Sequence, residues 1–366
     1  MFDSAAIRRI GVLTGGGDAP GLNAAIRAVA LTAHRHYGWE VVGILEGYDG
    51  LLSGGPTIQL TEERVRDVLT RGGTILGAVN RGNPFRRSTP GPDGSLIHED
   101  VSAEALVQID ELGLDALVVA GGDGTMAIAH HLVGLGARIV GVPKTIDNDL
   151  AYTDVTFGFD TAILTATEGL DRLATTAESH HRVMVMEVMG RNAGWIALMT
   201  GVAGGADAIL IPEIPFDIDL VATAIDSQRQ KGRRHSLIVV AEGAHPLGGE
   251  QEYYIRGDGL IERRLGGIGY LVGNLLADRL EAEVRVTVLG HLQRGGQPTP
   301  RDRWLASRFG NAAVHLVAEG KWGYMVALRG TQMQTVPMSE VVNGSKRVQP
   351  DSEMVRMARE MGIVFG

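Results

Sequence analysis

The chain alternates short apolar runs with longer stretches in which apolar residues recur at helical spacing. Runs rich in Val, Ile, Leu and Ala predict buried strands, and the amphipathic stretches predict helices. Strands are expected at 9–14, 40–45, 72–79, 115–120, 137–142, 181–188, 208–211, 236–241, 284–289 and 324–328. Helices are expected at 22–34, 102–112, 126–135, 161–176, 220–231, 268–280 and 301–319, with a further helix capped by Thr61. This alternation predicts an α/β protein with mainly parallel sheets.

Glycine-rich turns follow two of the expected strands. Gly15–Gly21 comes after the first strand, and Gly121–Thr125 follows the strand at 115–120. Glycines let backbone N–H groups approach a phosphate, and a helix that starts there adds partial positive charge. Such turns also occur as plain strand–helix connections. In the second turn Asp123 is placed to reach a magnesium ion, while the amides of Gly124 and Thr125 cradle phosphates.

An acidic pair follows the strand at 137–142. The segment Pro143–Leu150 carries Asp147 and Asp149, with Lys144 and Thr145 just before them. Residues at the carboxyl end of a parallel strand face the ligand crevice. One carboxylate can accept a proton from a substrate hydroxyl while the other holds a metal or orients its partner. The alternative is a turn with solvated aspartates, because Asp and Asn favour turns.

A basic loop follows the strand expected at 72–79. It holds Arg81, Arg86 and Arg87, and three arginines near a glycine can clamp phosphate. For Arg86 and Arg87 a solvated loop is favoured over a binding role.

Composition narrows the function classes. The 366 residues suggest two domains, and the formal net charge of −9 argues against a general nucleic-acid binder or a binder of acidic membranes. The sequence has no cysteine, which excludes disulfides and thiolate ligands. The sequence has no apolar run long enough to predict a signal peptide or a membrane span. A cytoplasmic protein without a membrane or nucleic-acid partner is expected.

Five motifs, taken in this order and spacing, resemble the 6-phosphofructokinase family along the whole chain. They are Gly11–Asn23, Gly121–Thr125, Pro143–Asp149, Met189–Arg191 and Gly290–Gly296. The Gly-Gly-Asp-Gly-Thr motif also occurs in NAD kinases and lipid kinases of related fold. The motifs Thr-Ile-Asp-Asn-Asp, Met-Gly-Arg and Gly-His-Leu-Gln-Arg-Gly-Gly are specific to the 6-phosphofructokinases.

The resemblance implies transfer of a phosphoryl group from a donor to the 1-hydroxyl of fructose 6-phosphate, with Mg²⁺ as cofactor. Asp147 resembles the general base, and Thr145, Asp149, Lys144 and Arg191 resemble its catalytic neighbours. Asp123 resembles the metal ligand. The donor-binding positions by resemblance are Gly16, Arg81, Gly122, Asp123, Gly124 and Thr125. The loop at 80–87 aligns poorly with the family, and Asn80 is the alternative to Arg81 at its position. The substrate-binding positions are Thr145, Asp147, Arg182, Met189, Gly190, Arg191, Glu242, Arg285, His291 and Arg294.

The identity of the donor stays open between ATP and pyrophosphate. Pyrophosphate-using relatives carry an aspartate where Gly124 stands, so glycine leaves room for a nucleotide. Lys144 is the residue typical of the pyrophosphate type, and this mixed pairing resembles the mixed-substrate group of the family. Sterics favour ATP, because a missing carboxylate removes both a clash and a charge repulsion.

The resemblance also implies quaternary structure and lobes. The family residues that match Arg182 and Arg285 reach in from a neighbouring subunit, so a homodimer or homotetramer with shared active sites is expected. Two Rossmann-like lobes are expected, with the chain crossing between them. Residues 1–158 and 293–343 would form the donor lobe, and 159–292 and 344–366 the fructose 6-phosphate lobe. Two other classes compete: an NAD- or lipid-kinase-like enzyme, and a non-catalytic regulatory subunit.

Overall fold

The computed structural model describes residues 7–52, 54–79, 82–90, 96–255 and 264–366. The chain divides into two compact units. Unit 1 comprises 1–146, 150–161 and 294–345, and unit 2 comprises 147–149, 162–293 and 346–366. Residues 147–149, which the sequence places in the first lobe, group with unit 2. Asp149 O accepts a hydrogen bond from Lys346 N of that unit at 2.9 Å.

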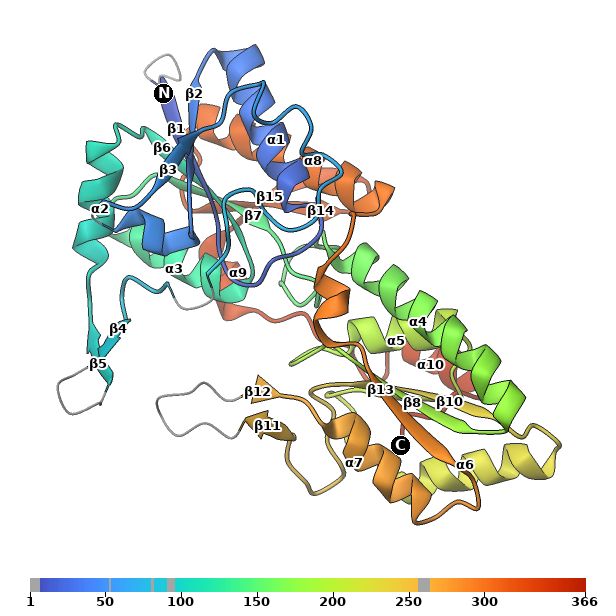
Figure 1. Ribbon diagram of the computed structural model, residues 1–366. Coiled ribbons are helices and arrows are strands. Elements are labelled where there is room, and N and C mark those ends of the chain that lie inside the picture. Colours follow the sequence, from blue (N-terminus) through green and yellow to red (C-terminus); the bar gives the residue numbers. More distant parts are fainter. Residues whose placement is uncertain (1–6, 53, 80–81, 91–95, 256–263) are drawn as a thin grey trace. The chain divides into compact units, whose positions relative to one another are not determined.

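Unit 1 is built on a seven-stranded sheet in the order β15-β14-β7-β6-β1-β2-β3 (Figure 1). Strands β2, β1, β6, β7 and β14 run parallel, and β3 and β15 are antiparallel at the edges. The strands are β1 (Arg9–Thr14), β2 (Glu40–Ile44), β3 (Thr57–Gln59), β6 (Ala116–Gly121), β7 (Ile139–Pro143), β14 (Tyr324–Arg329) and β15 (Gln332–Pro337).

Helices cover both faces of this sheet. On one face, α1 (Leu22–Thr32) packs beside α8 (Pro300–Ala318), with Phe309 and Val29 in their shared core. On the other face lie α2 (Ser102–Glu111), α3 (Asp123–Gly134) and α9 (Met338–Asn343). The remaining elements of the unit are η2 (Ala33–Tyr37), η3 (Gly47–Leu51) and the hairpin of β4 (Arg87–Pro90) and β5 (Leu96–Glu99).

Unit 2 contains a parallel sheet in the order β13-β8-β10-β9. Helices α6 and α7 pack on one face, and α4 and α5 on the other (Figure 1). The strands are β8 (Val183–Val188), β9 (Ala208–Leu210), β10 (Ser236–Ala241) and β13 (Val284–Val288). The other elements are α4 (Phe159–His180), α5 (Trp195–Ala203), α6 (Ile218–Gln230), β11 (Tyr253–Ile255), β12 (Arg264–Leu265), α7 (Ile268–Ala277), η4 (Gly290–Arg294) and α10 (Glu353–Glu360).

The α/β class with mainly parallel strands is therefore confirmed, but two expected elements are wrong. Residues 72–79 form an irregular loop with a turn at 75–76 instead of a strand, and 62–67 form turns instead of a helix. The buried Asn23 side chain explains the first difference. Its amide donates to Arg71 O and Gly72 O at 3.0 and 3.2 Å and accepts from Ile75 N at 2.8 Å. This side chain satisfies backbone groups that would otherwise need a strand partner.

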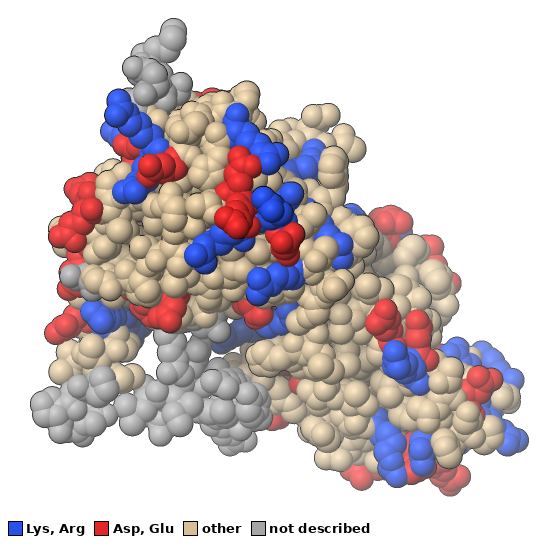
Figure 2. Space-filling view, turned by 45° about the horizontal axis from the view of Figure 1, so that its top comes forward, with Lys and Arg blue, Asp and Glu red and all other residues tan. Residues whose placement is uncertain are grey.

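The surface carries both signs of charge. On the face shown in Figure 2, Lys and Arg are interspersed with Asp and Glu. Elsewhere among the described residues, exposed ion pairs include Arg9–Glu40 and Arg35–Glu62, at 2.9 and 2.5 Å. Among the described helices, none is both long and apolar enough to span a bilayer.

Candidate functional site

Two glycine loops of unit 1 are pressed together around Thr125. A Cβ added to Gly15 or Gly121 would lie 2.7 or 2.3 Å from the Thr125 side chain, so both positions require glycine. Gly15 N donates to Ala120 O at 2.9 Å, and the buried Tyr48 hydroxyl donates to Thr125 O at 2.8 Å. These contacts hold the loops after β1 and β6 side by side at the carboxyl edge of the sheet.

The amino end of α3 lies in the second of these loops. Gly122 caps the helix, and Asp123 and Gly124 are its first residues and are exposed. Gly124 N donates to Asp123 Oδ1 at 2.7 Å, which fixes the carboxylate against the helix end. The second oxygen of an exposed carboxylate fits a magnesium ion, because proteins usually hold Mg²⁺ with one or two carboxylates plus substrate phosphates.

Two cations reach the first glycine loop. The Lys144 side chain is only 3% exposed, and its ammonium donates to Gly17 O. Arg294 Nη1 donates to Asp18 O at 3.1 Å, and a Cβ on Gly17 would lie 2.6 Å from that nitrogen. Arg294, which the sequence assigns to the acceptor, therefore contacts the Gly15–Gly21 loop within unit 1. Arg81 lies outside the described residues.

Positive φ angles shape the segments that carry the predicted site residues. Gly16 has φ 71°, and a Cβ there would lie 3.5 Å from Lys144 Nζ. Asn148 also adopts a left-handed conformation, with φ 54°, and it stands between the half-buried Asp147 and Asp149. Thr145 O, earlier in the same segment, accepts a hydrogen bond from Thr156 Oγ1 at 2.7 Å.

In unit 2, the turns after β8 and β10 meet. Glu242 N donates to Val188 O at 2.8 Å, and Gly243 N donates to Gly190 O at 3.1 Å. Gln251 Nε2 joins the same turns, since it donates to Arg191 O and Gly243 O at 3.2 and 3.0 Å. The structure thus brings Met189–Arg191 and Glu242 together at the carboxyl edge of this sheet.

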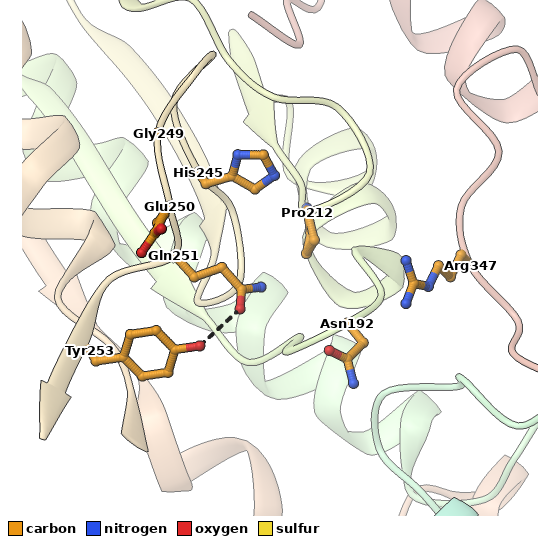
Figure 3. Close-up of a pocket in the computed structure, with 8 residues that line it drawn as sticks. All are labelled: Asn192, Pro212, His245, Gly249, Glu250, Gln251, Tyr253 and Arg347. Carbon is orange, nitrogen blue, oxygen red and sulfur yellow. Dashed lines mark hydrogen bonds between the residues drawn. The ribbon is translucent and has the colours of Figure 1, made fainter. Parts of the chain in front are cut away.

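A cavity of about 420 Å³ lies beside these turns (Figure 3). Its lining comes from loops after β8, β9 and β10, from the start of β11 and from the C-terminal segment. The lining residues are Asn192, Pro212, His245, Gly249, Glu250, Gln251, Tyr253 and Arg347. Tyr253 and Gln251 are joined by a hydrogen bond of 3.4 Å, which contributes to fixing the bridging amide of Gln251.

Gln293 connects η4 to the turn after β8. Its side chain is fully buried, accepts from Met189 N at 3.3 Å and donates to Gly290 O at 3.1 Å. His291, two residues earlier, is exposed. The sequence shows Gln293 inside the Gly290–Gly296 motif, but its positioning contact was not foreseen.

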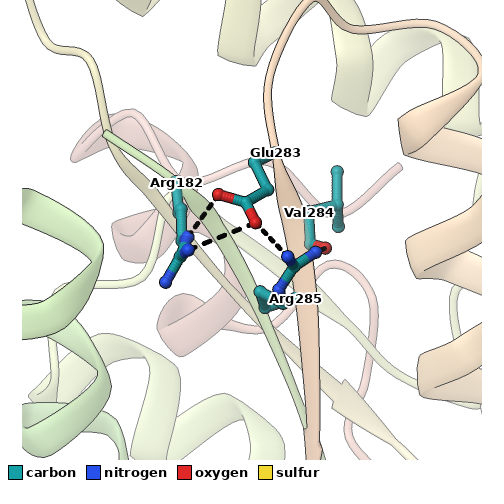
Figure 4. Close-up of polar contacts among 4 residues, drawn as sticks. All are labelled: Arg182, Glu283, Val284 and Arg285. Atoms are coloured by element: carbon teal, nitrogen blue, oxygen red, sulfur yellow. Dashed lines mark hydrogen bonds and ion pairs between the residues drawn. The ribbon is translucent and has the colours of Figure 1, made fainter. Parts of the chain in front are cut away.

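Arg182 and Arg285 lie at the opposite edge of the sheet. They stand at the amino ends of β8 and β13, where Glu283 pairs with both (Figure 4). The Arg182–Glu283 pair is 2.6 Å long. Because a strand rises about 3.3 Å per residue, Arg182 lies roughly 23 Å from Met189 at the other end of β8. Within one chain, these arginines do not join Met189–Arg191.

Comparisons with known proteins fit this arrangement of loops. A family model described as "Phosphofructokinase" matches residues 9–317. A Chloroflexus aurantiacus protein named "ATP-dependent 6-phosphofructokinase" is 54% identical, over 98% of this chain and 98% of that protein. A Clostridium perfringens protein named "ATP-dependent 6-phosphofructokinase 2" is 48% identical, with the same coverage of both chains. The chain belongs to the phosphofructokinase family.

Solved structures agree with that assignment. The phosphofructokinase from Saccharomyces cerevisiae has a TM-score of 0.75 and 35% identity, over 92% of this chain. This chain spans 45% of that yeast chain. A pyrophosphate-dependent phosphofructokinase from Marinobacter aquaeolei, at 23% identity and a TM-score of 0.79, shares the fold. A phosphofructokinase is a phosphotransferase with an alcohol acceptor, so the chain is an enzyme of that class.

Buried carboxylates support the second unit of this phosphofructokinase, and the sequence did not single them out. Glu187 on β8 accepts hydrogen bonds from Gly269 N at 2.8 Å and from Gly267 N, at the amino end of α7. Burial raises the pKa of Glu187, and these backbone donors oppose that rise. Burial likewise raises the pKa of Glu213, which accepts from Gly194 N and Val348 N. Each of these acids accepts hydrogen bonds at the start of a helix, Glu187 at α7 and Glu213 at α5.

Proposed function

We propose that the chain is an ATP-dependent 6-phosphofructokinase that transfers a phosphoryl group to the 1-hydroxyl of fructose 6-phosphate. The product would be fructose 1,6-bisphosphate, and the enzyme would act in glycolysis in the cytoplasm. The observation that carries the proposal is the 54% identity, over 98% of both chains, to a protein named ATP-dependent 6-phosphofructokinase. Phosphoryl transfer needs alignment and positive charge more than covalent chemistry, and loops with positioned amides and cations supply both.

The donor would be held by unit 1. The amides of Gly16, Gly122, Gly124 and Thr125 would surround its phosphates, and Lys144 would supply positive charge. Asp123 would hold Mg²⁺, whose chemistry is to neutralise phosphate charge. Arg294 contacts Gly17 and Asp18, and in this proposal it extends toward phosphate oxygens of either substrate.

The acceptor would be held by unit 2. The backbone of Met189 and Gly190 and the side chains of Arg191, Glu242 and His291 would bind the sugar phosphate. Glu242 would accept hydrogen bonds from sugar hydroxyls. Asp147 would take the proton from the 1-hydroxyl as it attacks, while Thr145 and Asp149 keep the hydroxyl in line.

Asp147→Ser tests this assignment. We expect kcat to fall by at least about 10²-fold, because a general base contributes roughly 10²–10⁴-fold. The matched control is Asp110→Ser, which changes an exposed aspartate of α2. Initial rates in an assay coupled to fructose 1,6-bisphosphate formation would measure both. Near-normal turnover of Asp147→Ser with a native circular dichroism spectrum would remove the base assignment.

The donor is ATP in this proposal because Gly124 leaves open space. A Cβ at position 124 would have no other atom within 4 Å, so the chain itself leaves room there for a nucleotide. Lys144 favours pyrophosphate as the second candidate, since its buried ammonium lies on the donor loop. Initial rates with each donor at matched magnesium decide between them, and turnover with pyrophosphate but not ATP would reverse the choice.

We also propose that active sites are shared between subunits of a homodimer or homotetramer. The support is the position of Arg182 and Arg285, which lie at the amino ends of β8 and β13, the whole length of the strands away from Arg191. Arg182 and Arg285 would therefore bind the 6-phosphate of a sugar held by another copy of the chain. Asp147→Ser and Arg285→Ala would each be inactive alone. Mixing them under reversible dissociation should restore part of the activity, because some hybrid sites contain neither change. A mixture that stays inactive, although native mass spectrometry shows hybrids, would contradict sharing.

A further inference from the structure

Lys346 makes two hydrogen bonds to the segment that carries the acidic pair. Lys346 Nζ donates to Asn148 Oδ1 at 2.8 Å, and Lys346 N donates to Asp149 O at 2.9 Å. Asn148 is 3% exposed and has φ 54°. Residues other than glycine adopt this left-handed conformation rarely, so contacts from outside the segment are needed to hold it.

Lys346 also contacts the start of α5. Trp195 Nε1 donates to Lys346 O at 3.0 Å, and Lys346 Nζ lies 5.7 Å from the centre of the Trp195 ring. Trp195 is the first residue of α5 and directly follows the turn that contains Arg191. The same lysine therefore connects the acidic segment to the turn that would bind the sugar phosphate.

Glu213 forms a second link between the turn at 189–194 and the segment that contains Lys346. The Glu213 carboxylate accepts from Gly194 N at 3.0 Å and from Val348 N at 2.8 Å, so it links the same turn to a residue two places after Lys346. Val348 is 1% exposed, which anchors this end of the segment in the core. All of these residues belong to unit 2, so the ties lie within one compact body.

We propose that Lys346 is a positioning residue for phosphoryl transfer, which holds Asp147 and Asp149 in register with the turn at 189–194. The inference rests on the proposed function, in which Asp147 is the base. Lys346 would touch neither substrate in this role. Its loss would let the acidic segment shift, and a shift of about 1 Å in a reacting group costs roughly 10²-fold in rate.

The test compares Lys346→Met, Lys346→Arg and Asn148→Gly in the full-length enzyme. Methionine keeps the length of the side chain but removes the ammonium, and glycine keeps the positive φ but removes the acceptor oxygen. We expect kcat to fall about 10- to 100-fold in Lys346→Met and Asn148→Gly, with KM for both substrates within about threefold of wild type. Lys346→Arg should recover most of kcat. The control is Arg356→Met, which changes an exposed residue of α10 in the same unit and should keep wild-type kcat.

The double variant Lys346→Met/Asn148→Gly separates positioning from independent damage. If the two residues act through one contact, the double variant loses no more kcat than the worse single variant. Three results would each overturn the proposal. Lys346→Met could keep wild-type kcat, or the losses of the two single variants could multiply in the double variant. The third result is a variant that has a lowered melting temperature but normal kcat at temperatures below melting. An active Asp147→Ser would instead overturn the proposed base, and that result is distinguishable because it does not involve Lys346.

Discussion

Gly243→Ala is the sharpest test of the turns after β8 and β10, which are proposed to bind the sugar phosphate. A Cβ at position 243 would lie 2.0 Å from Arg191 O, 2.8 Å from Arg191 C and 2.9 Å from Gly190 O. All three atoms are backbone, so no side chain can rotate away. Ordinary contact begins near 3.4 Å, which leaves a shortfall of about 1.4 Å that the turns after β8 and β10 must absorb.

The shift would fall on the residues proposed to bind the sugar phosphate. It would lengthen the hydrogen bond from Gly243 N to Gly190 O, now 3.1 Å, and those from Gln251 to both turns. Because a misplacement of about 1 Å costs roughly 10²-fold, we expect kcat/KM for fructose 6-phosphate to fall by about that factor. The KM for ATP should stay within about twofold, since the donor loops belong to unit 1.

The assay is steady-state kinetics with each substrate varied in turn, with melting temperatures measured on the same samples. Gly134→Ala is the control, because that exposed glycine of α3 has no other atom within 4 Å of a new Cβ. If Gly243→Ala keeps wild-type kcat/KM for fructose 6-phosphate, then the close approach of these turns does not set acceptor binding, and the reasoning fails.

Two further predictions concern the donor and the stability of the enzyme. Gly124→Asp should fold normally, because its Cβ meets open space, yet lower kcat/KM for ATP by at least about tenfold through clash and charge repulsion; unchanged ATP kinetics would contradict this. The Asp302→Asn variant tests the buried Asp302 carboxyl, whose pKa burial raises from 3.8 to about 6. The native state then binds the proton more tightly, so stability falls as pH rises from about 4 to about 6, by roughly 3 kcal/mol at 1.36 kcal/mol per unit. Urea unfolding across this range should show a flatter profile for Asp302→Asn, and parallel profiles would refute the assignment.

The sequence predicted the helices and strands whose residues carry their own apolar and turn signals. The strand at 9–14, its glycine turn and the helix from Leu22 follow directly from apolar runs and turn residues, and they stand as expected. Residues 72–79 carry the same apolar signal but form an irregular loop, in which the Asn23 side chain, about fifty residues away, bonds Gly72 O and Ile75 N and the adjacent Arg71 O. A stretch of sequence around 72–79 does not include Asn23, so the local pattern cannot predict this contact.

In the candidate site, too, some residues are predicted by local sequence and others are recognised only from the fold. Motifs predict which residues would carry the chemistry, since Asp123, Asp147 and Glu242 all follow apolar runs. The residues that hold them in place are not visible in the same manner. Lys346 and Asn148 are 198 residues apart, and Gln251 lies in an ordinary polar loop, so nothing near either residue marks its partner. Positioning contacts of this kind need the fold, because they depend on which strand ends become neighbours.

The grouping of residues 147–149 with unit 2 bears on how the base would work. β7 leads into this segment from unit 1, yet Asn148 and Asp149 are held by Lys346, which belongs to unit 2. The turns proposed to bind the sugar phosphate belong to the same unit. The distance between Asp147 and a bound sugar hydroxyl would therefore be set inside one compact body. General-base catalysis requires a fixed distance between the base and the proton it takes, and in this proposal the contacts that Lys346 makes within unit 2 help to set that distance.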